Sequence, residues 1–309
     1  MRRSLILLAL AVSTSSLQVL IATTAASDPV ITAAGDIASE GEPSTAQGET
    51  ARLVPSIDPR AALTLGDNQY QDGELADFEG KRVGVWDFGN EFEVTAAASE
   101  VGLEEGEDYE KVIQPFDMSL LLNREVDIAE AMIYNEYAQV LESVNPETGE
   151  LFQPEDLVVI DYNDVGTAML QDAIHARAAW LAEEGNEDIA IRFLAGAFKG
   201  WAYCRDNPDD CVQFTVDAGS TLGLGHQNWM MNEINALIWP SPDGIGDLPE
   251  DTWQKTIDIS VDAEIIDNPP AEGAYRTDLA EAARALVGDV DLTGADFTKG
   301  EVEVTPGGE

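Results

Sequence analysis

Short apolar segments with a strand pattern alternate with helical segments between Lys81 and Asp164. "KRVGVW" predicts a buried strand, and "EFEVTAAASEVG" directly after it predicts a helix with acidic residues in its first turn. Further strands are predicted in "YEKVIQ", "VDIAEAM" and "EDLVVIDYND", and further helices in "FDMSLLLNRE" and "IYNEYAQVLESV". This alternation predicts an α/β fold with a parallel or mixed sheet.

Polar and aromatic residues cluster where the expected strands end and helices begin. In open α/β sheets, ligands lie beyond the carboxyl ends of strands, close to helix N-termini. The candidate ligand-binding residues are Asn90, Glu91, Tyr134, Asn135, Glu136 and Tyr137. Tyrosine rings can stack on a ligand, amides read donor and acceptor edges, and a carboxylate accepts from a ring amine. The cluster therefore predicts a site for a neutral or cationic heterocycle.

Each of these residues also has an explanation without a ligand. Asn90 and Asn135 can cap helices, and Tyr134 can pack in the core. For any single residue this explanation has equal weight, and only the grouping at strand ends favours binding.

The chain from Val165 onward has a mostly helical pattern. One apolar stripe is predicted to run through Val165, Met169, Ala173, Ala176 and Trp180. That stripe leaves His175 on the exposed side of the predicted helix. Additional helices are predicted within residues 187–204, 226–246 and 277–287.

Residues 1–27 have the pattern of a secretory signal peptide: two arginines, an apolar stretch and small residues near its end. An uncleaved membrane anchor is the alternative, but polar residues at 13–16 and at Gln18 interrupt the apolar run. We therefore expect a secreted or extracytoplasmic protein. No later segment of the sequence is apolar for long enough to span a bilayer.

The chain is strongly acidic, with 16 basic and 59 acidic residues and a net charge of −43. Such a surface repels phosphate backbones, so nucleic acid and anionic membranes are excluded as expected partners. A salt-rich habitat would produce the same composition without any specific partner.

The two cysteines, Cys204 and Cys211, lie in "CRDNPDDC". In an oxidising compartment they can form a disulfide, and two buried free thiols are equally compatible with the sequence. A zinc site is less favoured because two cysteines supply only half of its ligands.

"DPVITAAGDIA" and "RAALTLGDNQY" each predict a strand that ends in Gly-Asp. Two such strands predict a parallel β-α-β unit with both carboxylates at one edge, which suits a divalent metal. Residues 28–79 resemble the start of a calcineurin-like metallophosphoesterase, through Asp36 in "GDI" and Asp67, Asn68 and Tyr70 in "GDNQY". The resemblance implies that Asp36 binds one metal ion and that Asp67 bridges two.

The metal centre of that family also needs several histidines, and the whole chain has two, His175 and His226. We therefore expect an incomplete site, no assigned catalytic residue and no cofactor, with a divalent metal bound only if this site is active.

A second resemblance covers residues 80–309. It rests on "GKRVGVWDFGNEFE", "QPFDMSLLL", "VDIAEAMIYNEYAQVLE", "NPETGELF", "DYNDVGTAMLQDAI", "GWAYCRDNPDDC" and "LIWPSPDGIG". These motifs resemble ABC-transporter solute-binding proteins for thiamine-pyrimidine, sulfonate and nitrate ligands, a superfamily that also contains the eukaryotic-type thiamine-pyrimidine synthase. The resemblance implies a periplasmic-binding-protein-like fold of two lobes that close on a small ligand, with a membrane permease as partner.

By this resemblance, residues 80–164 form the second lobe and residues 165–309 the remainder of the first. The strands that normally open the first lobe are replaced by residues 28–79, so we expect an incomplete first lobe. A junction is expected at residues 78–81, from a gene fusion or from an assembly error.

The leading expectation is an extracytoplasmic binding protein for a thiamine-precursor pyrimidine or a similar heterocycle, and not a catalyst. Loss of core strands predicts weak binding unless residues 28–79 substitute for them. The alternatives are a phosphomonoesterase and a thiamine-pyrimidine synthase-like protein. The synthase chemistry needs a lysine-bound pyridoxal phosphate and a cysteine-rich iron motif, and the latter is absent from this sequence.

Overall fold

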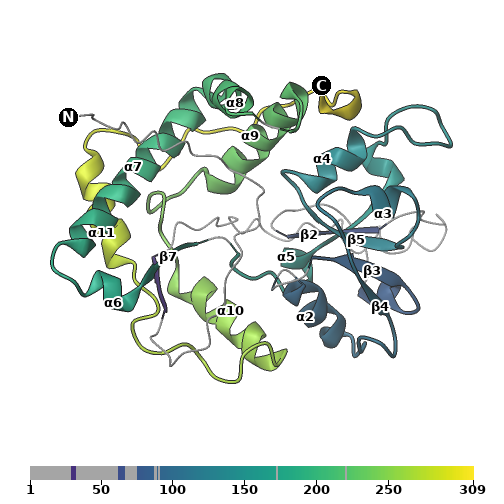
Figure 1. Cartoon of the computed structure of the whole chain (residues 1–309), viewed down its shortest axis with the longest axis horizontal. Coiled ribbons are helices and arrows are strands. Elements are labelled where there is room, and N and C mark those ends of the chain that lie inside the picture. The colour runs from purple at the N-terminus through teal and green to yellow at the C-terminus, as the bar shows by residue number, and fades with distance from the viewer. Residues whose placement is uncertain are drawn as a thin grey trace, which may run out of the picture.

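The computed structural model describes residues 29–32, 62–66, 75–86, 89, 91–171, 173–219 and 221–309. Its main sheet has five strands in the order β4-β3-β5-β2-β6 and lies in the right half of the molecule in Figure 1. The strands are β2 (Ala62–Gly66), β3 (Arg82–Val85), β4 (Glu110–Ile113), β5 (Ile128–Met132) and β6 (Val158–Asp161). All four strand pairs are parallel, which confirms the predicted α/β class.

Helices cover both faces of this sheet. The helices are α2 (Phe92–Glu100), α3 (Ser119–Leu122), α4 (Glu136–Leu141) and α5 (Tyr162–Val165), with the 3-10 turns η2 (Leu75–Phe78) and η3 (Pro154–Asp156). Successive residues of β5 point to opposite faces. Ile128 packs in one core with Val94 of α2, and Ala129 packs in the other core with Val140 of α4. Strand β5 is therefore mostly apolar because both of its faces are buried, with Glu130 as its charged residue.

The connections define where the strand order reverses. The chain runs from β3 through α2 to the edge strand β4, and then returns through α3 to β5 on the other side of β3. The reversal point therefore lies between β3 and β5, and the crevice beyond their carboxyl ends is where α/β sheets bind ligands.

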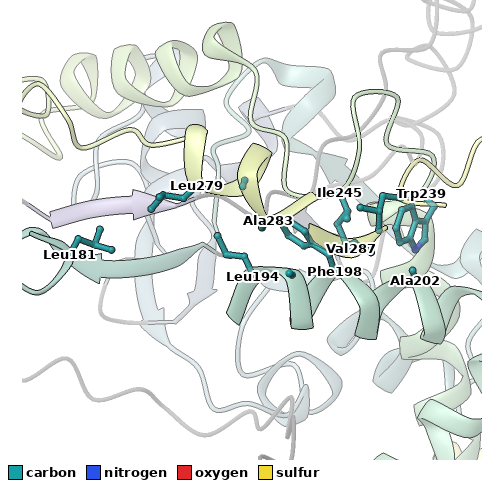
Figure 2. Packing of buried hydrophobic residues seen from close by; sticks show 12 residues of the cluster. Leu181, Leu194, Phe198, Ala202, Trp239, Ile245, Leu279, Ala283 and Val287 are labelled. Carbon is teal, nitrogen blue, oxygen red and sulfur yellow. The ribbon is translucent and has the colours of Figure 1, made fainter. Parts of the chain in front are cut away.

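The second half of the chain is mainly helical and lies beside the sheet in Figure 1. Its helices are α6 (Ala178–Leu181), α7 (Asn186–Asp206), α8 (Pro208–Asp217), α9 (Leu224–Ile238), α10 (Glu250–Asp262) and α11 (Asp278–Val287), followed by the 3-10 turn η4 (Pro306–Gly308). Figure 2 shows their core, in which Leu194 and Phe198 of α7 face Ala283 and Val287 of α11. Helices α8 and α10 were not predicted from the sequence pattern.

One predicted helix is wrong. The apolar stripe expected from Val165 to Trp180 is interrupted by strand β7 (Ile174–Arg177), which pairs antiparallel with β1 (Pro29–Thr32). Along β7 the residues alternate between half-buried and exposed, which is the period of a strand and not of a helix. His175 is exposed as predicted, but on a strand.

The predicted β-α-β unit of residues 28–79 is also wrong, because its two strands belong to different sheets. β1 pairs with β7, whereas β2 is the strand between β5 and β6 in the main sheet. That central position supplies β2 with hydrogen-bonding neighbours on both edges, which a two-strand unit could not offer. Asp36, Asp67, Asn68 and Tyr70 lie outside the described residues.

The segment where a junction was expected is a tight turn that follows the buried Phe78. Phe78 is fully buried in one core with Val83 and stacks edge-on against Tyr109, with ring centroids 6.1 Å apart. Gly80 adopts a φ of 74°, and its N–H donates to Asp108 O at 2.7 Å. Chain on both sides of residues 78–81 thus packs into a common core. The predicted domain limits at residues 27, 79 and 164 stay predictions.

Across the described part of the chain, no helix combines the length and apolar character needed to cross a bilayer. The predicted signal peptide, residues 1–27, lies outside the described residues.

Candidate ligand-binding site

A cavity of about 280 Å³ lies at the point where the strand order reverses. It is lined from the sheet side by Gly89, Phe92, Glu93, Met132 and Tyr134, and from the helical half by Met169, Leu170, Gln171, Thr256 and Ser260. The sheet-side residues follow β3 and β5 or end β5, so they occupy the crevice that this topology predicts. A cavity of this size suits a ligand with a single small ring.

Glu93 is the ionisable side chain on the wall of this cavity. It stands in the first turn of α2, is 4% exposed, and its Oε1 accepts a hydrogen bond of 2.9 Å from Gln171 Nε2. Burial raises the pKa of Glu93, and the Gln171 hydrogen bond partly opposes that rise. Because Gln171 belongs to the segment beyond the sheet, this bond connects the two sides of the cavity.

Glu130 lies behind this wall. It precedes Met132 on the same face of β5 and is 4% exposed. Its Oε2 accepts from Trp86 N at 3.2 Å, and its backbone oxygen accepts from Gln114 Nε2 at 2.8 Å. Burial first, and the neighbouring Glu93 second, raise the pKa of Glu130 well above its ordinary value.

A chain of buried hydrogen bonds runs from the start of α4 to α9. Asn135 Nδ2 donates to Glu136 Oε1 at 2.7 Å, and Asn135 Oδ1 lies 3.0 Å from His226 Nε2. On the other side of the ring, His226 Nδ1 lies 2.9 Å from both carboxylate oxygens of Glu142. Both ring nitrogens of His226 therefore face oxygen atoms of buried side chains.

Glu136 occupies the inner end of this chain and is 3% exposed. Its Oε2 accepts from Met132 N at 3.1 Å, so it ties the helix start to the end of β5. Burial raises the pKa of Glu136 from 4.5 to about 7. On β6, burial likewise raises the pKa of Asp161 from 3.8 to about 6.

Of the predicted ligand-binding residues, Tyr134 lines the cavity. Asn135, Glu136 and Tyr137 are buried beside it, and Tyr137 packs against Trp229 with ring centroids 6.2 Å apart. Asn90 lies outside the described residues.

Glu91, the remaining predicted residue, precedes α2 as its N-cap residue. Its Oε2 accepts from Gly89 N at 2.8 Å, so the side chain closes the loop after β3. Asp117, just before the next helix, accepts from Ser119 N at 2.9 Å in the same manner.

The sequence pattern missed Glu93, Gln171, Thr256 and Ser260. Glu93 could have been predicted from the sequence, because it lies at the same helix N-terminus as Glu91, which was chosen as a candidate. Gln171 is 78 positions from Glu93, and Thr256 Oγ1 accepts from Leu170 N across 86 positions at 3.0 Å. No local pattern predicts pairings of that range.

The structure joins Cys204 and Cys211 in a disulfide between the end of α7 and α8, with an S–S distance of 2.01 Å. Among the described residues, no group of three or more His, Cys, Asp or Glu side chains could hold a metal ion.

The family model described as "NMT1/THI5 like" matches residues 59–211, just under half of the chain. The matched segment contains the whole five-stranded sheet with Glu93, Tyr134 and Gln171, and it starts before the expected junction. No curated protein matches the chain. The family match indicates a solute-binding or thiamine-pyrimidine-related role with a small-molecule ligand. It gives no support to a metallophosphoesterase fragment or activity.

Proposed function

We propose that the protein is the substrate-binding component of an ABC transporter and holds a thiamine-precursor pyrimidine or a similar heterocycle. The observation that carries this proposal is the cavity between the ends of β3 and β5 and the helical half, at the reversal point of the sheet. The family match over the same segment supports it.

The cavity wall offers the chemistry that a polar single-ring ligand needs. Phe92 and Tyr134 provide aromatic surface, and Met132 and Met169 provide adaptable apolar contacts. Gln171 offers an amide that can donate and accept at once. A planar heterocycle in this cavity can therefore pack its faces against apolar and aromatic side chains and form hydrogen bonds along its edge.

Release and capture would occur by relative movement of the two sides. The Glu93–Gln171 bond joins them across the cavity, and α10 packs against α2 at its rim. Opening would break this bond and expose the cavity, whereas a bound ligand adds contacts to both sides and favours closure.

The sequence pattern of residues 1–27 and the resemblance of residues 80–309 support the transporter part of the proposal. Residues 1–27 would export the chain, and a membrane permease would receive the ligand from the closed form. In the part that the structure describes, the helical half carries a two-stranded sheet, β1 with β7, and we propose that this reduced first lobe still closes the cavity.

A synthase-like role uses the same family resemblance but a different site. That chemistry needs a lysine to hold pyridoxal phosphate, and the cavity-lining residues that the structure describes include no lysine. Binding without catalysis is therefore the better interpretation of this cavity.

Isothermal titration calorimetry of the exported chain with a panel of aminopyrimidines tests the proposal. We expect saturable binding, weakened at least about tenfold by Gln171→Ala, equivalent to about 1.4 kcal/mol. The matched control is Gln254→Ala, which removes an exposed glutamine of α10 outside this cavity and should leave the affinity unchanged. If the unmodified protein binds no heterocycle of the panel, the proposal is wrong.

A further inference from the structure

The described lining of the cavity carries an acidic side chain and no basic one. Among its described lining residues, Glu93 is ionisable at neutral pH, and none is a lysine, arginine or histidine. The other polar groups are the Gln171 amide and the hydroxyls of Tyr134, Thr256 and Ser260. Both aliphatic hydroxyls already donate to backbone carbonyls of α10, at 3.2 and 2.6 Å.

An oxyanion would be poorly stabilised here. Sulfonate, nitrate, phosphate and carboxylate groups need several donors or a cation when they leave water. When Glu93 is ionised it supplies acceptors and no donor, and its charge repels an anionic ligand at close range.

The helix N-terminus at the rim does not reverse this balance. The first turn of α2 carries partial positive charge, which by itself favours anions. Glu91 and Glu93 stand at that turn, and Glu91 already accepts the Gly89 N–H beside the cavity. Carboxylates of the chain itself therefore already lie at the positive end of this helix.

Glu130 is a second buried carboxyl group, directly behind Glu93. Glu93 and Glu130 are both almost fully buried, and no salt bridge among the described residues involves either of them. Burying a carboxyl group without a cation is costly, and the cost is relieved when a positive partner arrives. A ligand cation in the cavity would be that partner.

We propose that this cavity selects a positively charged, donor-rich nitrogen group, such as an amidinium or a protonated aminopyrimidine ring, and rejects oxyanions. Glu93 is the residue that determines this choice, with Glu130 behind it. The inference rests on the proposed function, because it concerns the same cavity, and it narrows the ligand to one charge class.

Benzamidine, benzamide and benzoate test the proposal because they share one ring and one size but carry positive, zero and negative charge. Titrated into the unmodified protein at neutral pH, benzamidine should bind at least about tenfold more tightly than benzamide, a difference of about 1.4 kcal/mol. Benzoate should show no saturable binding. Benzoate binding as tightly as benzamidine would overturn the inference.

Variants locate the effect. Glu93→Gln keeps the shape and can still accept from Gln171, so it should reduce the preference for benzamidine over benzamide to less than about threefold, or about 0.7 kcal/mol. The matched control is Glu100→Gln, an exposed carboxylate at the other end of α2, which should keep the full preference. An unchanged preference in Glu93→Gln would contradict the assignment. If that variant does not fold, Glu130→Gln should lower the same preference, and the order of the three compounds on the unmodified protein still decides the question.

The outcomes separate this inference from the proposed function. If neutral heterocycles bind but none of the three benzene compounds does, the binding function stands and charge selection is wrong. If no compound of either panel binds, the binding function itself is wrong and the inference falls with it.

Discussion

His226 Nδ1 on α9 lies 2.9 Å from both carboxylate oxygens of Glu142, the residue that follows α4, and so connects the helical half to the sheet. The histidine is 1% exposed and the glutamate 8%. The C-terminal segment closes over this pair, since Gly307 N donates to Glu142 O at 2.9 Å. The pair therefore anchors three parts of the chain at one buried point.

Replacing His226 by alanine should lower the free energy of unfolding by about 3 kcal/mol, because Glu142 would be left as a buried charge without its partner. Urea denaturation followed by circular dichroism measures this change. His175→Ala is the matched control. Because this histidine is exposed, its replacement should change the free energy of unfolding by less than about 0.5 kcal/mol. Additive effects of His226→Ala and Glu142→Gln in a double-mutant cycle would show that the two side chains do not interact.

Glu136 should make the protein less stable as the pH rises. Its pKa is raised by burial from 4.5 to about 7, so between these values the folded state holds more protons than the unfolded state. Stability is therefore full below pH 4.5 and falls until about pH 7 is passed, by about 3 kcal/mol in total for this shift. Asp161 acts in the same direction between 3.8 and about 6.

Glu136→Gln isolates this effect. Urea titrations over a pH series should show that the variant loses less stability than the unmodified protein between acidic and neutral pH. Glu155→Gln, at an exposed position of η3, should follow the unmodified curve. Parallel curves for all three proteins would rule out Glu136 as the source.

Alanine substitution should lower the stability of the protein at Gly246 and raise it at Gly196. Gly246 has a φ of 80°, and a Cβ atom there would collide with the ring of Phe198 in the core of Figure 2. Gly246→Ala should destabilise the protein by about 2 kcal/mol, through overpacking and backbone strain. Gly196 lies on the exposed side of α7, where an added methyl group would meet nothing within 4 Å, so Gly196→Ala should add about 0.5 kcal/mol. Thermal unfolding measures the melting temperatures of the two variants. Equal shifts of the two melting temperatures would contradict this packing.

Removing the disulfide should weaken the helical half. Cys204 and Cys211 are separated by 7 positions, and opening a loop of that length should lower the free energy of unfolding by about 2.5 kcal/mol. The double variant Cys204→Ser/Cys211→Ser should lose that amount without a reductant. Dithiothreitol should destabilise the unmodified protein by a similar amount and leave the double variant unaffected. A reductant effect on both proteins would point to another cause.

The local patterns of the sequence determined the α/β class, strands β3 to β6 and most of the long helices. Those features could be predicted because strand and helix periodicities depend on neighbouring residues. Short apolar segments such as residues 83–85 are typical of strands that a parallel sheet buries on both faces. The ends of β3 and β5 could be chosen as the binding edge for the same reason, and Tyr134 is on the cavity wall.

Tertiary packing alone decided which distant segments meet. It placed β2 between β5 and β6, made residues 174–177 a strand opposite β1, and brought Gln171 to Glu93 and His226 to Glu142. The two side-chain pairs join residues 78 or more positions apart. The strand pairs join segments whose own residues would fit several partner strands. The energy of such contacts depends on the burial and geometry of both partners together, so it becomes defined only when the two parts of the chain are packed against each other.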